Sequence, residues 1–359
     1  MDNLKKIALL CNYELLPERV GGMDYFFWEF DASCKRNNIQ IDWFFPNKSN
    51  HGDYNKLTIY ASGNQSIEAF FLDFSKKHEP TYTHIITQFV ALCTPFFKKI
   101  KQLSTAEVIG VDHNPRPLKG YSLKKKIEKK VKGFLFSRYI DQFVGVSDYT
   151  VKEVIRDFGF HVKSKSKTIY NGVFIDSIEE RKERNYNKPS FLVASHLRES
   201  KGIQDLIVAV SLLPTAILAE IEITVFGDGP YKEELIVLVQ EHAVISNFKF
   251  MGSQANLNEL YCKFDYMLQP THMECFSLSI LESLSANVPV ITTSVGGNEE
   301  IIRNGENGFI FEPKDSNTLK DLIELIYLGN IKIESNTRKA IEMNFSLNKM
   351  VENHLQLLS

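Results

Sequence analysis

The sequence lacks the features that mark several common classes of protein. Its 359 residues contain no run of 18 apolar residues, so no segment is expected to span a membrane as a helix. The formal net charge is -2, and without a basic excess a nucleic-acid-binding protein is not expected. The five cysteines are scattered and form no Cys-x-x-Cys pair, which gives no support to a zinc site or a disulfide framework. No Asp-x-Asp pair suited to a metal ion is found.

What is present is the composition of a globular enzyme. Hydrophobic residues make up 43% of the chain and charged residues 24%. The odd number of cysteines is typical of a reducing compartment. The apolar run Ile7–Leu10 is too short for a signal peptide and polar Asn12 follows it, so a buried strand is expected there. We therefore predict a cytoplasmic protein.

Length and element order predict two domains. A single hydrophobic core rarely extends over a chain of 359 residues. Strands and helices alternate in both halves, which favours parallel sheets with helices on both faces. The charged segment 176–189 loses this periodicity and is a candidate linker. The predicted fold class is α/β, with two Rossmann-like, doubly wound parallel-sheet domains, 1–175 and 190–345, facing each other across a cleft.

The expected elements follow from hydrophobic periodicity and from turn and cap residues. In the first half the expected strands are 6–11, 40–45, 83–88, 107–111, 142–146 and 167–170, and the helices are 22–35 and 148–158. In the second half the expected strands are 190–194, 221–226, 248–251, 266–269 and 290–293, and the helices are 202–212, 232–241, 257–264 and a closing helical stretch.

Two glutamates eight residues apart form the most informative motif. A helix that begins near Ser277 places Glu282 inside the helix and Glu274 in the loop before it. The first backbone N–H groups of such a helix carry the positive end of its dipole and can hold a phosphate. A carboxylate on either side can receive hydroxyl groups. The segment therefore predicts a site for a sugar nucleotide.

Three further segments follow expected strands of the second half, where open parallel sheets bind ligands. Arg198 and Lys201 can turn toward a diphosphate, the guanidinium as a fork and the ammonium as a point charge, or they are solvated loop charges. Gly227 lets a backbone approach a ligand closely, or makes a tight turn. Gly252 belongs to a segment that could offer amides to a base, or is a plain strand end.

Taken as a set, these motifs resemble the family 4 (group 1) retaining nucleotide-sugar glycosyltransferases of GT-B fold. The resemblance extends over nearly the whole chain. In the second half it rests on the Glu-x7-Glu pair of Glu274 and Glu282, on Lys201-Gly202, on Gly227-Asp228-Gly229-Pro230, and on Val295-Gly296-Gly297 with Glu300. In the first half it rests on Gly21-Gly22, His113, and Ser147 with Ile169-Tyr170-Asn171-Gly172-Val173.

The resemblance implies a nucleotide-diphosphate sugar as donor on the second domain and a glycan or lipid-linked acceptor on the first. The anomeric configuration would be retained, with no metal and no cofactor beyond the donor. Glu274 would be catalytic and contact the transferred sugar, and Glu282 would bind ribose hydroxyls. The loop residues Phe276, Ser277 and Leu278 would contact the diphosphate through their backbone amides, together with Arg198 and Lys201 as cations.

The resemblance also assigns residues of the first half. His113 would be a catalytic-site histidine that orients the acceptor hydroxyl or the donor sugar. Gly21 and Gly22 would touch the donor phosphate or the acceptor, although a tight strand-to-helix turn explains them equally well. A terminal helix within 346–359 would cross back to the first domain, as in relatives.

The sequence departs from the family pattern at several positions. The usual phosphate-binding arginine would fall on His196, so we expect Arg198 to take over this contact, with His196 as the second candidate. Ser277 replaces a glycine and narrows the space beside the phosphate, and Asn287 replaces another glycine. These changes bear on affinity and donor choice.

The segment 119–136 has the strongest local charge bias. Leu123, Ile127, Val131 and Phe134 recur at helical spacing among lysines. The pattern fits an interfacial helix that makes peripheral contact with an anionic membrane at its inner face. It fits a packed helix with a solvated basic face as well.

The predicted activity is therefore sugar transfer in polysaccharide biosynthesis, such as that of lipopolysaccharide or another cell-envelope glycan. Three alternatives stay open. A sugar-nucleotide epimerase or a glycan phosphorylase uses the same architecture, and a non-catalytic sugar-nucleotide binding protein would need the same pocket.

Overall fold

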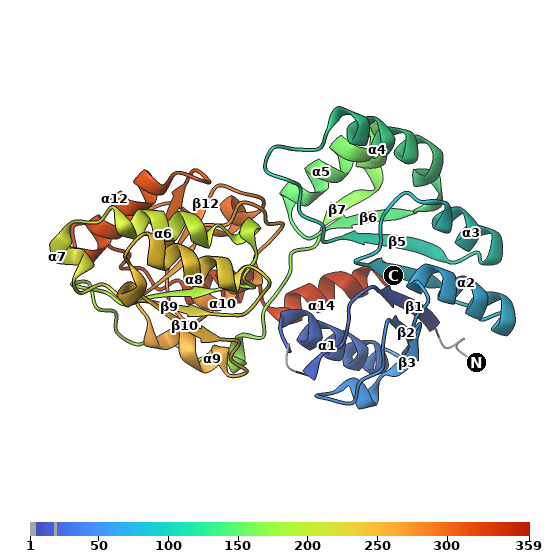
Figure 1. Ribbon diagram of the computed structural model, residues 1–359. Coiled ribbons are helices and arrows are strands. Elements are labelled where there is room, and N and C mark those ends of the chain that lie inside the picture. Colours follow the sequence, from blue (N-terminus) through green and yellow to red (C-terminus); the bar gives the residue numbers. More distant parts are fainter. Residues whose placement is uncertain (1–4, 18–19) are drawn as a thin grey trace. The chain divides into compact units, whose positions relative to one another are not determined.

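The computed structural model describes residues 5–17 and 20–359. The chain divides into two compact units (Figure 1). Unit 1 comprises Met1–Gly172 together with Leu347–Ser359, and unit 2 comprises Val173–Ser346. The predicted architecture of two parallel-sheet α/β domains is confirmed, because each unit contains one such sheet.

Unit 1 is built on a seven-stranded parallel sheet with the order β3-β2-β1-β4-β5-β6-β7. Its strands are β1 (Lys5–Cys11), β2 (Ile39–Phe45), β3 (Thr58–Ala61), β4 (His84–Gln88), β5 (Glu107–Asp112), β6 (Gln142–Gly145) and β7 (Ser166–Thr168). Its helices are α1 (Gly22–Arg36), α2 (Ile67–His78), α3 (Pro95–Leu103), α4 (Leu123–Phe136), α5 (Asp148–Phe158) and α14 (Leu347–Leu355).

The inner strands of unit 1 are apolar on both faces because both faces of the sheet are covered there. Alternate side chains of a strand point to opposite sides of the sheet. On one side Phe44 packs edge-on against Phe71 of α2, with ring centroids 4.9 Å apart. On the other side Trp43 meets Phe27 of α1 at 5.5 Å, and its indole N–H donates to buried Asp31. This two-sided burial is the condition under which all-parallel sheets occur.

Unit 2 contains a six-stranded parallel sheet with the order β10-β9-β8-β11-β12-β13. Its strands are β8 (Phe191–Ala194), β9 (Ile223–Phe226), β10 (Phe248–Gly252), β11 (Tyr266–Gln269), β12 (Val290–Thr293) and β13 (Gly308–Phe311). Its helices are α6 (Ile203–Ser211), α7 (Thr215–Leu218), α8 (Lys232–Glu241), α9 (Leu257–Leu260), α10 (Leu278–Ser285), α11 (Asn298–Ile301), α12 (Ser316–Tyr327) and α13 (Arg338–Asn344).

The strand order reverses once in each sheet. In unit 1 the chain runs from β1 outward to β3 and then returns to place β4 on the other side of β1. In unit 2 the corresponding reversal lies between β8 and β11. At such a switch point the loops from neighbouring strands lead away in opposite directions, and ligands bind beyond the carboxyl ends of these strands.

The segment 176–189, predicted as a linker, is part of unit 2. The Arg184 guanidinium donates to the carbonyl oxygens of Asn287 at 3.0 Å and Ser335 at 2.7 Å. Arg181 forms an ion pair of 2.6 Å with buried Asp265. Hydrophobic periodicity is absent from this segment because its backbone is irregular and is held against unit 2 by these side-chain contacts. The chain passes between the units after Gly172 and again after Ser346.

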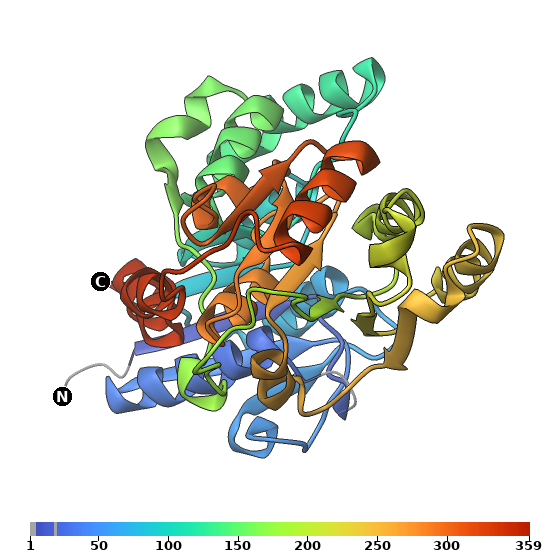
Figure 2. The same cartoon turned by 90° about the vertical axis from the view of Figure 1, so that its left-hand side faces the viewer.

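The C-terminal helix α14 packs against α1, and both views show the two helices side by side (Figures 1 and 2). His354 is buried between Phe26 and Phe30, with ring centroids 4.7 and 6.0 Å away. Burial lowers the pKa of His354 to about 4. The last residues of the chain therefore complete the core of the unit that contains the first residues.

Several elements differ from the expected ones. Strands β3 and β13 and helices α2, α3, α7 and α11 carry no prediction. The expected helix 257–264 is divided into α9 and a single 3₁₀ turn, Tyr261–Lys263. Residues 1–4 and 18–19 of the first predicted domain lie outside the described residues.

Candidate active site at the switch point of unit 2

Two loops meet at the switch point of unit 2, one after β8 and one after β11. The backbone N–H of His272 donates to the carbonyl oxygen of Ser200 at 2.8 Å, and the Thr271 hydroxyl donates to the same oxygen at 3.2 Å. Gly202 has a φ of 70°, and a Cβ at this position would lie 1.8 Å from the Pro270 carbonyl oxygen. Only glycine combines this conformation with this approach.

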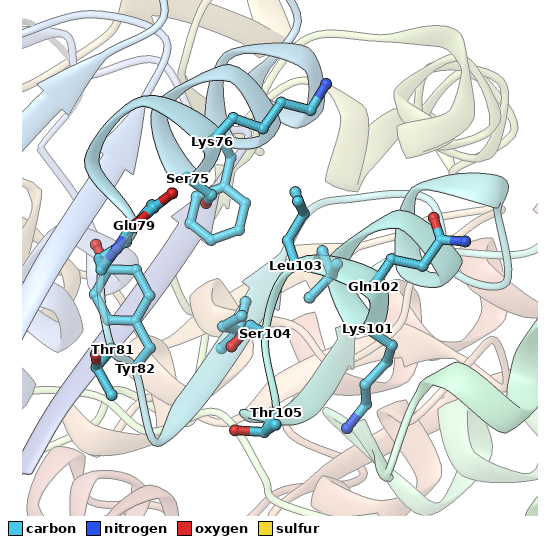
Figure 3. A pocket seen from close by; sticks show the side chains of 14 residues that line it. Ser75, Lys76, Glu79, Thr81, Tyr82, Lys101, Gln102, Leu103, Ser104 and Thr105 are labelled. Carbon is cyan, nitrogen blue, oxygen red and sulfur yellow. The ribbon is translucent and has the colours of Figure 1, made fainter.

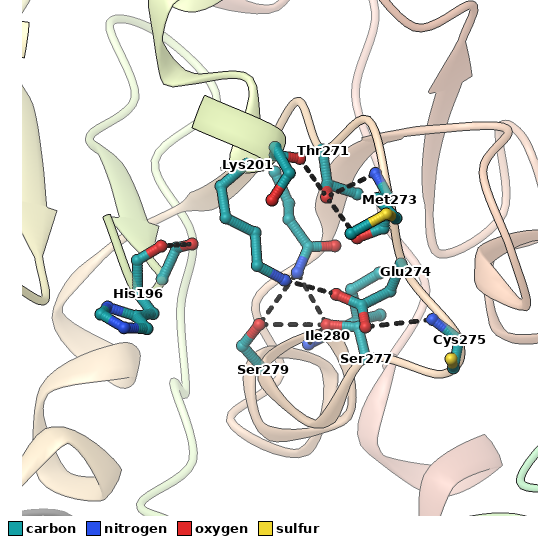
Figure 4. A network of polar contacts seen from close by, with 12 residues as sticks. His196, Lys201, Thr271, Met273, Glu274, Cys275, Ser277, Ser279 and Ile280 are labelled. Atoms are coloured by element: carbon teal, nitrogen blue, oxygen red, sulfur yellow. Dashed lines mark hydrogen bonds and ion pairs between the residues drawn. The ribbon is translucent and has the colours of Figure 1, made fainter. Parts of the chain in front are cut away.

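An ion pair joins the two loops through predicted site residues. The Nζ atom of Lys201, after β8, lies 2.8 Å from Oε2 of Glu274, after β11 (Figure 4). The side chains keep 23% and 16% of their exposure, so both groups are sheltered but reach solvent. The other carboxylate oxygen of Glu274 accepts the backbone N–H of Cys275 at 3.2 Å. The structure thus brings together a cation and a carboxylate that are 73 residues apart in the chain.

The Glu274 loop is supported from the side of β12 by the motif Val295-Gly296-Gly297. Gly296 has a φ of 67°, and a Cβ there would lie 2.1 Å from the Glu274 carbonyl oxygen. The Gly297 N–H donates to the Cys275 carbonyl oxygen at 2.9 Å. These two glycines fix the backbone on which the Glu274 carboxylate is carried.

Ser277 is the N-cap of α10, and its hydroxyl is turned into the protein. The buried Oγ accepts from the Ile280 N–H at 3.4 Å and from the Gln269 amide at 2.7 Å. We expected this side chain to narrow the space beside a bound phosphate. Its hydroxyl is instead bound by Gln269 of β11. The N–H groups of Leu278 and Ser279, at the first two helical positions, have no carbonyl partner within the helix. They carry the positive end of the helix dipole.

Glu282 lies one turn further along α10 in a partly buried position. The hydroxyl of Tyr261 donates to its Oε2 atom at 2.9 Å, and Tyr261 itself is fully buried. Burial raises the pKa of Glu282 to about 7 because the charged carboxylate is removed from water. The hydrogen bond from Tyr261 opposes this rise but is the smaller effect.

The remaining predicted residues of unit 2 lie in the loops after β8 and β9 and at the end of β10. Arg198 is exposed. His196 is also exposed, and its Nδ1 lies 2.5 Å from the Asp228 carbonyl oxygen. Gly227 has a φ of 124°, and a Cβ there would lie 1.9 Å from the Ser195 carbonyl oxygen, so its absent side chain lets the two loops touch. Gly252 has a φ of 68°, with open space where a Cβ would be.

In unit 1, His113 follows β5 and stacks on Phe89, which follows β4. The ring centroids are 4.2 Å apart and the rings are inclined by 19°. Tyr13, after β1, lies 5.7 Å from the Phe89 ring. Burial lowers the pKa of His113 to about 3 although Asp112 opposes the change, so the imidazole is neutral at pH 7. His113 therefore belongs to an aromatic row at the carboxyl ends of three neighbouring strands.

Gly21 and Gly22 begin α1. Gly21 is the N-cap, and its N–H donates to Oδ2 of Asp24 at 2.9 Å. Asp24 is fully buried and also accepts the hydroxyl groups of Tyr13 at 3.1 Å and Tyr54 at 2.6 Å. The amide of Gly21 is thus bound by a side chain of its own helix.

Sequence reasoning missed Tyr261, Gln269, Tyr13 and Phe89. A signal existed for Gln269, which is a polar residue at the end of an otherwise apolar strand. The other three have no such signal, because an aromatic residue in a sequence is most often a core residue. Among the described residues, no group of three or more His, Cys, Asp or Glu side chains is arranged to hold a metal ion.

Unit 1 also contains a cavity of about 630 Å³ (Figure 3). It is lined by the ends of α2 and α3 and by the segments that lead into β4 and β5, including Tyr82 and Ser104. These segments lie at the amino ends of the strands, whereas His113 lies at the carboxyl ends. The cavity is therefore at the opposite edge of the sheet from the aromatic row.

The chain has the GT-B fold, which consists of two Rossmann-like domains. The crystal structure of Anabaena Alr3699/HepE in complex with UDP-glucose is similar over 98% of this chain and 99% of that chain, with a TM-score of 0.75 at 17% identity. Residues 174–343, slightly less than half of the chain, match the family described as Glycosyl transferases group 1. The matched segment corresponds to unit 2, which carries the Lys201–Glu274 pair.

Curated relatives match the chain over shorter segments. N-acetyl-alpha-D-glucosaminyl L-malate synthase of Bacillus anthracis is 33% identical over 127 residues, which are 35% of this chain and 33% of that protein. Glycogen synthase of Mycobacterium tuberculosis (strain ATCC 25618 / H37Rv) is 30% identical over 126 residues, 34% of this chain and 30% of that protein. The chain thus spans about a third of the length of these relatives. Together the findings show that unit 2 is similar to the group 1 glycosyltransferases.

Replacing Gly202 with alanine tests the contact between the two loops. Gly202→Ala combines a left-handed backbone with a steric conflict at Pro270, so we expect the free energy of unfolding to fall by about 2–4 kcal/mol. Gly252→Ala is the matched control, because the backbone is equally left-handed but the space is open, and about 1 kcal/mol is expected. Urea unfolding measures both. Equal losses would contradict the assigned contact.

The raised pKa of Glu282 predicts a pH-dependent stability. A carboxyl whose pKa is raised by folding stabilises the protein below its unfolded value and loses that contribution as pH rises through about 7. Glu282→Gln should therefore raise the free energy of unfolding at pH 8 by about 1–3 kcal/mol and change it little at pH 5. Unfolding curves of both proteins at the two pH values measure this. The same difference at pH 5 and pH 8 would show that Glu282 is ionised in the folded state throughout.

Proposed function

We propose that the protein is a glycosyltransferase that moves a sugar from a nucleotide-diphosphate sugar to a glycan or lipid-linked acceptor, with retention of the anomeric configuration. The observation that carries this proposal is the Lys201–Glu274 pair beside the amino end of α10. A cation, a carboxylate and the first N–H groups of a helix, together at one switch point, match the phosphate and the hydroxyl groups of such a donor.

The donor diphosphate would bind at the first turn of α10. The N–H groups of Leu278 and Ser279 would supply donors, and the ammonium group of Lys201 would supply charge. The ammonium group of Lys201 can reach a phosphate there, because it hydrogen-bonds to Glu274 in the loop that leads into α10. On binding, the ammonium would exchange the carboxylate for a phosphate oxygen, which frees Glu274 to accept hydroxyl groups of the sugar. Exposed Arg198 would provide a second cation on the solvent side.

Glu282 would receive hydroxyl groups of the ribose. One of its oxygens already accepts the Tyr261 hydroxyl, which holds the carboxylate in one orientation. A bound ribose would add two donors to this group. Hydrogen bonds to the charged form favour that form, so donor binding would lower the pKa of Glu282 from about 7.

The transfer step requires that negative charge be stabilised on the departing nucleotide. The bond between the anomeric carbon and the phosphate oxygen breaks, and its electron pair leaves with the nucleoside diphosphate. The acceptor hydroxyl oxygen bonds to the anomeric carbon from the same face, and its proton passes to the leaving phosphate. Fixed donors and cations at the leaving group lower the barrier. Because Lys201, Arg198 and the α10 amides supply these charges, we propose that no metal ion is required.

His113 would orient a hydroxyl group through a hydrogen bond. It would not act as a general base that takes the proton of this group and becomes cationic. With a pKa of about 3 it is neutral at pH 7, so it can accept or donate one hydrogen bond without changing charge. The neighbouring aromatic rings of Phe89 and Tyr13 would add apolar contacts with a sugar ring.

The GT-B architecture is the basis for the proposed acceptor, a glycan or a lipid-linked glycan. We place the protein in the synthesis of a cell-envelope polysaccharide or a related glycan at the inner face of the membrane, as a member of family 4. No helix in the described part of the chain is long and apolar enough to cross a membrane.

A nucleotide-binding screen tests the donor site. Calorimetry with UDP, GDP, ADP and their glucose conjugates should detect one of them, and Arg198→Ala and Glu282→Ala should each weaken that binding by about tenfold or more, since a charge-assisted hydrogen bond contributes about 1.5–3 kcal/mol. Arg303→Ala is the matched control, because Arg303 is an exposed arginine of unit 2 and should have no effect. The site assignment is wrong if no nucleotide binds, or if all variants bind like the wild type.

Turnover tests the role of Glu274. Glu274→Gln keeps the size of the side chain but removes its charge, so transfer and donor hydrolysis should fall by roughly a hundredfold or more while nucleotide affinity changes less than tenfold. Glu306→Gln, an exposed carboxylate of unit 2, is the control. Chelation with EDTA should leave the rate unchanged.

Product analysis by NMR separates the candidate reactions. A retained anomeric configuration in a glycosylated acceptor supports the proposal. An inverted product, an altered free nucleotide sugar or a released sugar phosphate would each contradict it.

A further inference from the structure

Helix α4 exposes a continuous apolar stripe. The side chains of Leu123, Ile127, Val131 and Phe134 are 74%, 56%, 50% and 79% exposed. Their spacing of three and four residues places them one above the other on a single helix face. Single exposed apolar side chains are common on protein surfaces, but an aligned group of this size marks an interaction site. We call these four residues the α4 stripe.

The stripe is not the face by which α4 packs. Gly133 is buried, and a Cβ at this position would lie 2.1 Å from the carbonyl oxygen of Phe158 in α5. On the same side Lys129 forms an ion pair of 3.0 Å with buried Asp157. Helix α4 therefore contacts α5 at Gly133. A rotation of α4 that buried the stripe would break this contact. The sequence is consistent with an interfacial helix or with a packed helix that has a solvated basic face. A packed helix would bury the four apolar residues, whereas these residues are exposed.

Unpaired positive charge borders the stripe. The segment 119–136 contains seven lysines and one glutamate, in a chain whose formal net charge is -2. Lys125 and Lys132 pair with Glu128. Lys124, Lys126 and Lys130 are exposed and make no ion pair with any residue in 5–17 or 20–359. Long lysine side chains can keep their charge in the headgroup layer while their stems lie along apolar surface.

We propose that the α4 stripe and its lysines form a docking surface for the face of an anionic lipid bilayer. The apolar side chains would enter the boundary between headgroups and acyl chains, and Lys124, Lys126 and Lys130 would meet lipid phosphates. Charge complementarity selects this occupant, because a second copy of the chain would bring the same unpaired lysines against one another.

Within unit 1 the docking surface is connected with the loop that carries His113. Helix α4 begins ten residues after His113, and the loop between them runs from the carboxyl end of β5. Its Arg116 is buried in ion pairs with Asp112 at 2.7 Å and Asp157 at 2.9 Å, which ties the His113 loop to α5 beneath α4. A bilayer held at α4 would thus lie beside the loop that carries His113. The membrane contact itself does not depend on the proposed sugar transfer.

Vesicle sedimentation with the full chain tests the proposal. At low salt the wild type should sediment with vesicles of phosphatidylcholine and phosphatidylglycerol, and should remain in solution with vesicles of phosphatidylcholine alone. Ile127→Ser/Phe134→Ser and Lys124→Gln/Lys126→Gln/Lys130→Gln should each reduce the bound fraction at least about tenfold. All five positions are exposed, so folding should be unaffected, and thermal unfolding checks this.

Matched variants give the controls. Ile245→Ser removes an apolar residue that is 57% exposed in unit 2, and Lys77→Gln/Lys98→Gln/Lys99→Gln removes the same charge from exposed positions of α2 and α3. Both should bind like the wild type. The proposal is overturned if the wild type does not bind anionic vesicles, or if the controls lose as much binding as the α4 variants.

Two further outcomes would identify a different surface. If the lysine variant loses binding while Ile127→Ser/Phe134→Ser keeps it, α4 attracts polyanions without entering a bilayer, and the proposal is wrong. A dimer in light scattering that Phe134→Ser dissociates would show that a second copy covers the stripe. Nucleotide binding measured in the same variants should be unchanged, so a failure of the docking surface is distinguishable from a failure of the donor site.

Discussion

The contact between the β8 and β11 loops is the constraint on which the site of unit 2 depends. The strand order places these two strands side by side although 71 residues separate their ends in the chain, from the Ala194 end of β8 to the Tyr266 start of β11. Gly202 permits the backbones to touch, and two hydrogen bonds to the Ser200 carbonyl oxygen fix the contact. The Lys201–Glu274 pair then forms between residues whose positions are fixed by backbone contacts. Such preorganisation is what makes fixed charges effective in catalysis.

Polar groups beneath the site hold its parts in position. Gln269 joins the end of β11 to the N-cap hydroxyl of Ser277, and Tyr261 orients the Glu282 carboxylate. Each of these groups is largely removed from water and would cost free energy if left unpaired. The network therefore favours a single arrangement of the α10 start. In unit 1 the buried ion pairs of Arg116 have a similar effect on the loop after β5.

Much of the fold could be predicted from local patterns. The alternation of apolar strands and amphipathic helices indicated parallel sheets, and the predicted strands 40–45 and 266–269 agree closely with β2 and β11. The linker prediction at 176–189 differs from the structure, in which this segment is bound to unit 2. A charged sequence without periodicity is typical of irregular backbone, whether the segment is packed on a domain or connects two domains. Arg181 and Arg184 bind partners far along the chain, and no local pattern encodes such partners.

The sequence by itself determined the type of each domain and the residues that carry charge near the start of α10, since strand periodicity and helix caps depend on neighbours in the chain. Only the tertiary structure decided that Lys201 meets Glu274, that Tyr261 meets Glu282, and that the apolar residues of α4 face outward. These outcomes depend on which elements become neighbours in space. The pairing of strands and the packing of α4 on α5 are set by long-range contacts, and these cannot be derived from the spacing of residues along one segment.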